Sequence, residues 1–123
     1  IFYHQLIKEK FLPQYTASAD YGVHMMENTC LNHEYALPNK FFEYLNSGLP
    51  VIVSNLVEMS KFVKKYNCGY VVAFNEKKFL NQIEVLEIKK LKKFKVYLKK
   101  VHCENNWEIQ SKKIINIYKN LLK

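Results

Sequence analysis

The segment from Tyr35 to Asn55 constrains the fold of this chain more than any other part of the sequence. It reads YALPNKFFEYLNSGLPVIVSN, and Pro38 suits the first turn of a helix, which we predict over Pro38–Ser47. Gly48 then supplies a stop, because glycine readily adopts the left-handed conformation that follows many helices. The apolar run Val51–Val53 comes next, as a short buried strand would. A helix joined by a glycine turn to a buried strand is typical of parallel α/β folds.

The same segment carries residues suited to a nucleotide. Glu43 lies four residues after Asn39, and residues four apart share one face of a helix. The free N–H groups at a helix start favour anions, while a carboxylate accepts hydrogen bonds from a pair of hydroxyls. A phosphate next to a ribose presents both groups at about that separation, so the spacing predicts a nucleotide site. Lys40 is either a phosphate contact or a surface lysine, and Asn39 either touches the ligand or caps the helix.

Short apolar strands alternate with helices in the first part of the chain. Strands are predicted at Ile1–Tyr3 (the end of a strand), Tyr21–Met25, Val51–Val53 and Tyr70–Ala73. Helices are predicted at Phe11–Ala19, Pro38–Ser47 and Val57–Tyr66, with a long polar loop over Glu27–Leu37 and with Gly69 as the left-handed cap of the third helix. This alternation predicts an α/β fold in which a Rossmann-like parallel sheet with βαβ units occupies residues 1–75.

Residues 76–123 show only a helical pattern. Two apolar stripes at helical spacing stand out, one within Ile88–Val101 and one within Trp107–Leu122. The first stripe comprises Ile88, Leu91, Phe94, Leu98 and Val101, and the second comprises Trp107, Ser111, Ile114, Ile115, Tyr118 and Leu122. We therefore expect two or three C-terminal helices that follow the sheet.

The length of 123 residues suits one domain with a sizeable core. We treat residues 1–123 as a single domain. The chain begins with Ile1 rather than Met, in a context that already looks like a strand. We expect it to be the C-terminal piece of a longer protein.

The positive charge is concentrated in the tail. Residues 1–88 hold 8 lysines and 9 acidic residues, whereas residues 89–123 hold 11 lysines and 2 glutamates. All 19 basic residues are lysines, so bidentate guanidinium contacts to guanine or phosphate are excluded within this chain. The lysine-rich helix Ile88–Val101 is either an ordinary amphipathic helix with a solvated face or a contact with an anionic membrane surface. We expect no nucleic-acid partner.

The cysteines and histidines show no metal or disulfide framework. Three cysteines without CxxC spacing favour a reduced, cytoplasmic compartment, and we expect a location in the cytoplasm or at the inner face of the membrane. Cys30 and His33 have the spacing of two metal ligands, but no second pair suits them. Asp20 is the single aspartate, so an Asp-x-Asp metal motif cannot occur here. We expect no metal and no cofactor.

Four stretches of this sequence resemble a known family. They are ASADYGVHMM, ALPNKFFEYLNSGLPVIVSNLVEM, NCGYVV and WEIQSKKIINIYKNLL. Together they resemble the C-terminal domain of group 1 glycosyltransferases of the GT-B fold, over roughly residues 12–73 and 107–122. The block FEYLNSGLPVI is the most specific part, because it joins a carboxylate to a glycine-capped helix and a buried strand.

The resemblance implies that this domain binds a nucleotide-sugar donor. It implies that Glu43 binds the ribose hydroxyls and that the loop and helix start lie against the diphosphate and the donor sugar. Those loop and helix-start residues are Ala36, Leu37, Pro38, Asn39 and Lys40. Family members commonly carry a second glutamate eight positions before the first, where this chain has Tyr35 with Glu34 beside it. Tyr35 is either a ligand contact or an anchor of its loop.

The reaction implied by the resemblance is metal-independent transfer of a sugar from a nucleotide diphosphate to a glycan or lipid-linked acceptor, with retention of configuration. The nucleotide sugar is a substrate, and an N-terminal domain of the same protein would bind the acceptor and supply the basic pair that neutralises the leaving diphosphate. No catalytic residue is assigned in this chain. Two alternatives stay open, a non-catalytic module that binds nucleotides or a membrane surface, and a GT-B sugar-nucleotide epimerase.

Overall fold

The fold is a three-stranded parallel sheet with helices between the strands, followed by C-terminal helices, as the sequence predicts. The computed structural model describes residues 3–86 and 88–122. The strands β1 (Gly22–His24), β2 (Val51–Ser54) and β3 (Gly69–Val72) lie in the order β1-β2-β3. Val51 pairs with Gly22 on one side and with Gly69 on the other, so the three strands start level with one another.

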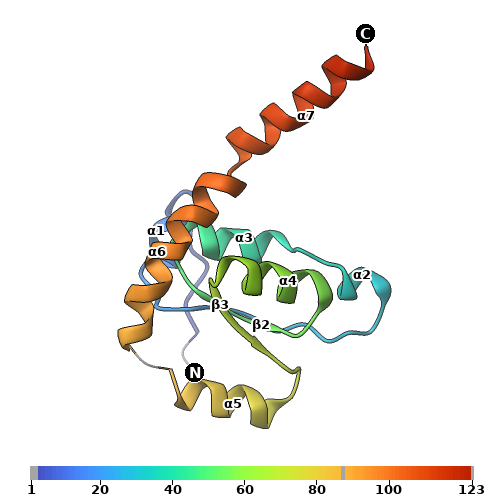
Figure 1. Cartoon of the computed structure of the whole chain (residues 1–123). Helices are drawn as coiled ribbons and strands as arrows, with labels where there is room; N and C mark the ends of the chain where they lie inside the picture. Colours follow the sequence, from blue (N-terminus) through green and yellow to red (C-terminus); the bar gives the residue numbers. More distant parts are fainter. Residues whose placement is uncertain (1–2, 87, 123) are drawn as a thin grey trace.

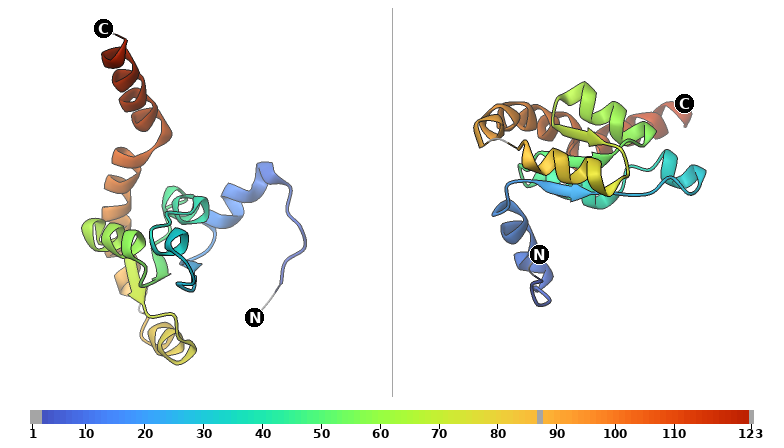
Figure 2. Two further views of the ribbon diagram at one scale, coloured as in Figure 1. Left: turned by 90° about the vertical axis from the view of Figure 1, so that its right-hand side faces the viewer. Right: turned by 90° about the horizontal axis from the view of Figure 1, so that it is seen from below.

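Eight helical segments surround or follow this sheet in the described residues. They are η1 (Glu9–Phe11), α1 (Leu12–Ala17), α2 (Leu31–Glu34), α3 (Asn39–Asn46), α4 (Val57–Tyr66), α5 (Glu76–Glu84), α6 (Ile88–Asn105) and α7 (Trp107–Leu121). Helices α3 and α4 lie side by side on one face of the sheet, and α6 packs across them (Figure 1). Helix α7 continues from α6 and points away from the sheet, as Figure 1 and the left view of Figure 2 show.

The core lies between the sheet and the layer formed by α3, α4 and α6. Val51 and Val53 are fully buried on this face of β2. They pack against three sets of helical side chains, Phe41 and Leu45 of α3, Met59 and Val63 of α4, and Phe94, Leu98 and Val101 of α6. Each fully buried side chain of this size contributes about 1.5–3 kcal/mol relative to an exposed one. The apolar stripe predicted for α6 is thus confirmed for its last three members.

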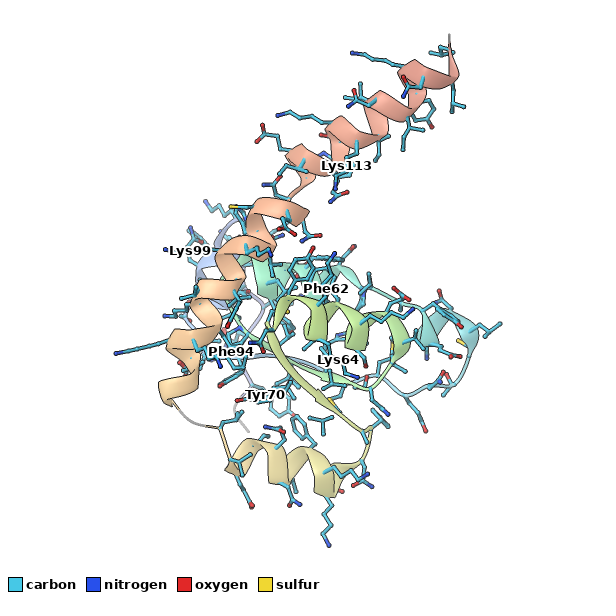
Figure 3. The ribbon with its side chains drawn as sticks, in the orientation of Figure 1. Phe62, Lys64, Tyr70, Phe94, Lys99 and Lys113 are labelled. Carbon is cyan, nitrogen blue, oxygen red and sulfur yellow. The ribbon has the colours of Figure 1, made fainter. Side chains whose placement is uncertain are left out.

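Two tyrosines, Tyr21 and Tyr70, lie near each other and pack against this core. The ring centroids of Tyr21 and Tyr70 are 6.2 Å apart, and the ring of Tyr70 meets Phe94 edge-on at 5.3 Å (Figure 3). Burial, followed by the neighbouring Tyr70 phenol, raises the pKa of Tyr21 to about 12. The phenol of Tyr21 is therefore neutral at physiological pH.

Two glycines have the roles that their backbone geometry requires. Gly48 has a φ of +78° and ends α3, as predicted. The predicted left-handed cap at Gly69 is wrong, because Asn67 takes that conformation after α4, with a φ of 48°. Gly69 instead begins β3, where an added Cβ would clash with the carbonyl oxygen of Val51. Close approach of β3 to β2, rather than a positive φ, makes glycine necessary there.

The described residues differ from the predicted elements in three further places. The segment predicted as a loop over Glu27–Leu37 contains the short helix α2. Of the strand predicted at Ile1–Tyr3, only Tyr3 is described, and it is exposed and outside the sheet. The stripe predicted in Trp107–Leu122 forms on α7, but most of its apolar members are exposed. No helix in the described part of the chain is both long enough and apolar enough to cross a bilayer.

Candidate functional site

The carboxyl edge of the sheet carries the starts of two helices. Helix α3 follows β1 through the loop 25–38, and α4 follows β2 directly. The two segments are joined at this edge, because the buried Ser54 side chain accepts a hydrogen bond of 3.0 Å from the backbone N–H of Met26. Ligands of open parallel sheets bind outside the carboxyl ends of the strands. This edge is therefore where a site is expected on topological grounds.

The first turn of α3 has backbone donors without partners. Pro38 occupies the N-cap position with extended backbone, and no side chain of the described residues caps the helix. The N–H of Phe41 bonds back to the Pro38 carbonyl at 3.0 Å, which leaves the amides of Asn39 and Lys40 at the open end. By contrast, α5 is capped by the side chain of Asn75. An uncapped helix start is suited to an anion.

The position of Asn39 settles one of the alternatives left by the sequence. Asn39 is the first residue of α3 and not its N-cap, so the interpretation of Asn39 as a capping residue is wrong. The structure does not test its contact with a ligand. The helix starts one residue later than predicted, since Pro38 flanks the helix instead of opening it.

Lys40 and Glu43 form an ion pair on the exposed face of α3. The distance from Lys40 Nζ to Glu43 Oε2 is 3.2 Å, and the side chains are 56% and 49% exposed. Such an exposed pair contributes only about 0–1 kcal/mol. Either side chain can therefore exchange its partner for a ligand at little cost, Lys40 for a phosphate and Glu43 for a pair of hydroxyls.

Glu43 borders a groove between α1 and α3. The groove has a volume of about 660 Å³, and its lining includes Glu43 and Asn46 of α3, the following Ser47, and Leu12, Pro13 and Thr16 of α1. Glu43 thus lies at the side of a hollow that is large enough for part of a nucleotide. The open amides of α3 do not line this groove, although Asn39 and Glu43 share a helix face one turn apart.

The loop before α3 places its residues on the other side of the helix start. Leu37 lines a separate hollow of about 280 Å³ together with Lys61, Phe62 and Lys65 of α4. Tyr35 is mostly exposed at the end of α2, and Glu34 is half-buried within α2. Ala36 follows and donates its N–H to the carbonyl of His33 at 3.3 Å. The structure therefore joins Lys40 to Glu43 but places Leu37 in a different hollow.

His33 closes the loop between β1 and α3. Its Nδ1 lies 2.9 Å from the carbonyl oxygen of Glu27 and 3.0 Å from the hydroxyl of Thr29. The imidazole of His33 therefore joins two parts of this loop, and this structural role explains a histidine here without a bound metal. Among the described residues, no three His, Cys, Asp or Glu side chains are grouped as a metal site would require.

His24 ends β1 at the same edge of the sheet. Its Nε2 is buried without a partner among the described residues, and burial lowers the pKa of the imidazole below its ordinary value. A neutral imidazole is therefore favoured there. The sequence alone gave no reason to prefer His24 as a site residue over a core histidine.

Sequence reasoning did not identify two contributors to this edge. One is Ser54, whose buried hydroxyl fixes the loop that leads to α3. The other is the start of α4, which also has no side-chain cap. The turn Ser54–Leu56 between a buried strand and a helix was the available signal for both, since such turns begin many anion sites.

Comparison with protein families gives one match that spans most of the chain. The model of the family described as "Glucosyltransferase 3-like, C-terminal domain" matches residues 1–114. Searches of curated proteins and of solved structures found no match.

Proposed function

Because this chain belongs to the glucosyltransferase 3-like C-terminal domain family, we propose that it is the donor-binding domain of a glycosyltransferase of the GT-B type. Its donor would be a nucleotide diphosphate sugar. The sugar would be glucose, because the family is described as glucosyltransferase 3-like. One observation carries the proposal. The uncapped start of α3 and the exposed Lys40–Glu43 pair lie within one helical turn of each other, at the carboxyl edge of a parallel sheet.

The donor would be held from both ends of the first turn of α3. The amides of Asn39 and Lys40 would donate hydrogen bonds to the diphosphate. The positive end of the helix dipole would stabilise the bound diphosphate by about 0.3–1 kcal/mol per charge, or by up to about 2 kcal/mol where the site is partly buried. Glu43 would accept hydrogen bonds from the two ribose hydroxyls after releasing Lys40. Lys40 would then be free to approach the phosphates.

The same groups would also assist the reaction. Transfer breaks the bond between the anomeric carbon of the sugar and a phosphate oxygen, and negative charge grows on the departing diphosphate. Donors fixed in place toward that charge lower the barrier, because they need no reorganisation as the bond breaks. The single aspartate of the chain offers no Asp-x-Asp metal motif. We therefore propose transfer without a metal and, from the GT-B resemblance, with retention of configuration.

The remaining parts of the site would come from elsewhere in the protein. We propose that residues 1–123 form one domain and that a separate N-terminal domain binds the acceptor, a glycan or a lipid-linked sugar. Ala36, Leu37 and Tyr35 would contact the donor sugar only if the loop before α3 moves toward Glu43, because Leu37 now faces α4.

The test is the affinity of the full-length protein for UDP-glucose and GDP-glucose, measured by calorimetry. Hydrogen bonds to a charged group contribute about 1.5–3 kcal/mol, so Glu43→Ala is expected to weaken donor binding by about 10- to 150-fold. The change in the free energy of unfolding should stay below about 1 kcal/mol, since the Lys40–Glu43 pair is exposed. Glu84→Ala, on the exposed surface of α5, is the matched control.

Two outcomes would contradict this proposal. Equal donor affinity in Glu43→Ala and Glu84→Ala would remove Glu43 from the site. Donor binding without any hydrolysis or transfer by the full-length protein would instead favour the non-catalytic alternative.

A further inference from the structure

The connection between β1 and α3 is the long one at the carboxyl edge of the sheet. It comprises the 14 residues 25–38, whereas two residues join β2 to α4 and three join β3 to α5. Connections in compact domains commonly have about two to six residues, and those longer than about 12 are usually functional or disordered. This connection is folded, and Figure 1 shows it, with α2 in it, at the end of the sheet opposite α6. A long connection that is folded points to a function.

His33 holds the two halves of this connection together. Nδ1 of its ring lies 2.9 Å from the carbonyl oxygen of Glu27 and 3.0 Å from Thr29 Oγ1. Because a carbonyl oxygen can only accept, the proton is assigned to Nδ1, which donates it to Glu27. The same carbonyl accepts the N–H of Thr29 at 3.1 Å, so both of its lone pairs are in use. The imidazole thereby ties the beginning of the connection to α2.

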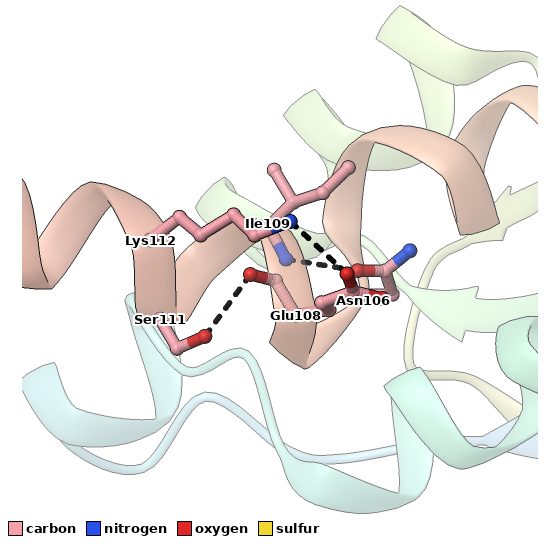
Figure 4. A network of polar contacts seen from close by, with 5 residues as sticks. All are labelled: Asn106, Glu108, Ile109, Ser111 and Lys112. Atoms are coloured by element: carbon pink, nitrogen blue, oxygen red, sulfur yellow. Dashed lines mark hydrogen bonds and ion pairs between the residues drawn. The ribbon is translucent and has the colours of Figure 1, made fainter.

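This bond differs from the side-chain bonds that begin other helices. The caps of α5 and α7 join residues three apart, within one turn, as Figure 4 shows for Asn106 and the N–H of Ile109 at 3.0 Å. The bond from His33 to Glu27 spans six residues and joins α2 to the chain before it. Helix α2 has only four residues and no side-chain cap among the described residues. So short a helix is unstable by itself, so contacts such as the His33 bond must hold it.

The unit that His33 ties together leads directly into the candidate donor site. The N–H of Ala36 bonds back to the His33 carbonyl at 3.3 Å, which extends this unit over residues 27–36. Only Leu37 and Pro38 then separate it from α3. Any movement of the unit toward the groove beside α1 would therefore carry its residues as one body.

Helix α3 is held in place by other contacts. Phe41 and Leu45 are buried in the core, so the position of this helix does not depend on the connection before it. In the proposed donor site, the open amides of Asn39 and Lys40 and the carboxylate of Glu43 would hold the nucleotide. The connection would meet only the sugar. The two ends of the donor would thus depend on different parts of the chain.

On the premise that α3 binds the donor, we propose that His33 is a positioning residue for the sugar of that donor. It touches no substrate. Its imidazole holds residues 27–36 in one arrangement before the donor arrives. Ordering a segment costs conformational entropy, so a segment that is ordered in advance binds its ligand more tightly. His33 would therefore raise the affinity for the sugar nucleotide but not that for the nucleoside diphosphate alone.

The experiment compares two substitutions of His33 in the full-length protein by calorimetry. The amide nitrogen of asparagine is attached to Cγ, as Nδ1 of histidine is, whereas that of glutamine is one bond further out. His33→Asn therefore keeps a donor at the place of Nδ1, and His33→Gln does not. The ligand is whichever of UDP-glucose and GDP-glucose the wild-type protein binds more tightly, and its own nucleoside diphosphate is measured beside it.

His33→Gln should weaken binding of the sugar nucleotide by about fivefold, the factor that one hydrogen bond typically contributes to an equilibrium. Its affinity for the nucleoside diphosphate should stay within about twofold of wild type, which also shows that α3 is intact, and His33→Asn should keep both affinities within about twofold. Hydrogen exchange at the Ala36 amide should accelerate by about fivefold in His33→Gln but not in His33→Asn. His102→Gln makes the same change at an exposed histidine of α6 and should alter none of these values.

Three results would overturn this role of His33. Equal affinity of the wild-type and His33→Gln proteins for the sugar nucleotide would show that other contacts, such as those of the N-terminal domain, order the connection. Equal losses for the sugar nucleotide and the nucleoside diphosphate would show a general structural effect, as would equal losses in His33→Asn and His33→Gln. Failure of the wild-type protein to bind any of these ligands would instead overturn the proposed donor site, and the role of His33 with it.

Discussion

The hydrogen bond between Ser54 and Met26 gives the sharpest test of how the sheet positions the candidate site. The Ser54 side chain is fully buried at the end of β2, and its hydroxyl is the acceptor for the N–H of Met26 in the loop that leads to α3. Ser54→Ala removes the acceptor while keeping the backbone and most of the volume. A buried donor left without a partner costs about 1–3 kcal/mol. Because the loop can partly relax, we expect a loss of about 1–2 kcal/mol.

The loss can be measured in two ways. For a chain of this length, 1–2 kcal/mol corresponds to a decrease in Tm of about 4–8 °C. Urea denaturation followed by circular dichroism gives the free energy of unfolding directly. Hydrogen exchange at the Met26 amide should accelerate by at least about tenfold if the loop is released locally.

Ser60→Ala is the matched control for this variant. The Ser60 hydroxyl is also buried, but it has no hydrogen-bond partner among the described residues. Removal of an unpaired hydroxyl within α4, together with the higher helix propensity of alanine, should leave stability unchanged or raise it slightly. Equal stability of the Ser54→Ala and Ser60→Ala proteins would refute the role assigned to the Ser54–Met26 bond.

Three further predictions concern the sheet, its buried thiol and its tyrosine pair. Gly69→Ala should lower the free energy of unfolding by about 3 kcal/mol or more, because the new Cβ would meet the Val51 carbonyl; an unchanged urea midpoint would contradict this. Burial raises the pKa of the Cys68 thiol to about 12, so in a titration with a thiol reagent it should react only on unfolding, whereas the two exposed cysteines react in the native protein. The raised pKa of Tyr21 means that the native state holds this proton more tightly than the unfolded state, whose pKa is near 10. Stability is therefore retained below pH 10 and declines toward pH 12, and denaturation curves of Tyr21→Phe should show a smaller decline.

Much of the fold could be predicted from local patterns. The strands around Val23, Ile52 and Val71 and the helices between them follow from short apolar runs and helical spacing, and the structure confirms the parallel pairing of these strands. Phe41 and Leu45 are buried on the side of α3 away from Glu43, as helical spacing requires. These features depend on residues that are close together in the sequence, so the local sequence pattern is enough to predict them.

The candidate site could be predicted only in part. Glu43 and Lys40 lie on one face of α3 because their spacing requires it. That Glu43 borders a groove with α1, and that Leu37 turns toward α4, depends on how separate helices pack around the sheet. The binding of a donor by these residues stays a prediction.

The sequence by itself determined which side chains share a face, as in α3, α6 and α7, because helical periodicity is a local property. Tertiary structure decided what each face meets. The stripe of α6 is buried against Val51 and Val53, whereas the similar stripe of α7 faces outward. It also decided that Asn67, at the end of α4, takes the left-handed turn, while Gly69 begins β3 in close contact with Val51. Burial is set by contacts between segments far apart in the chain, and no single stretch of sequence contains them.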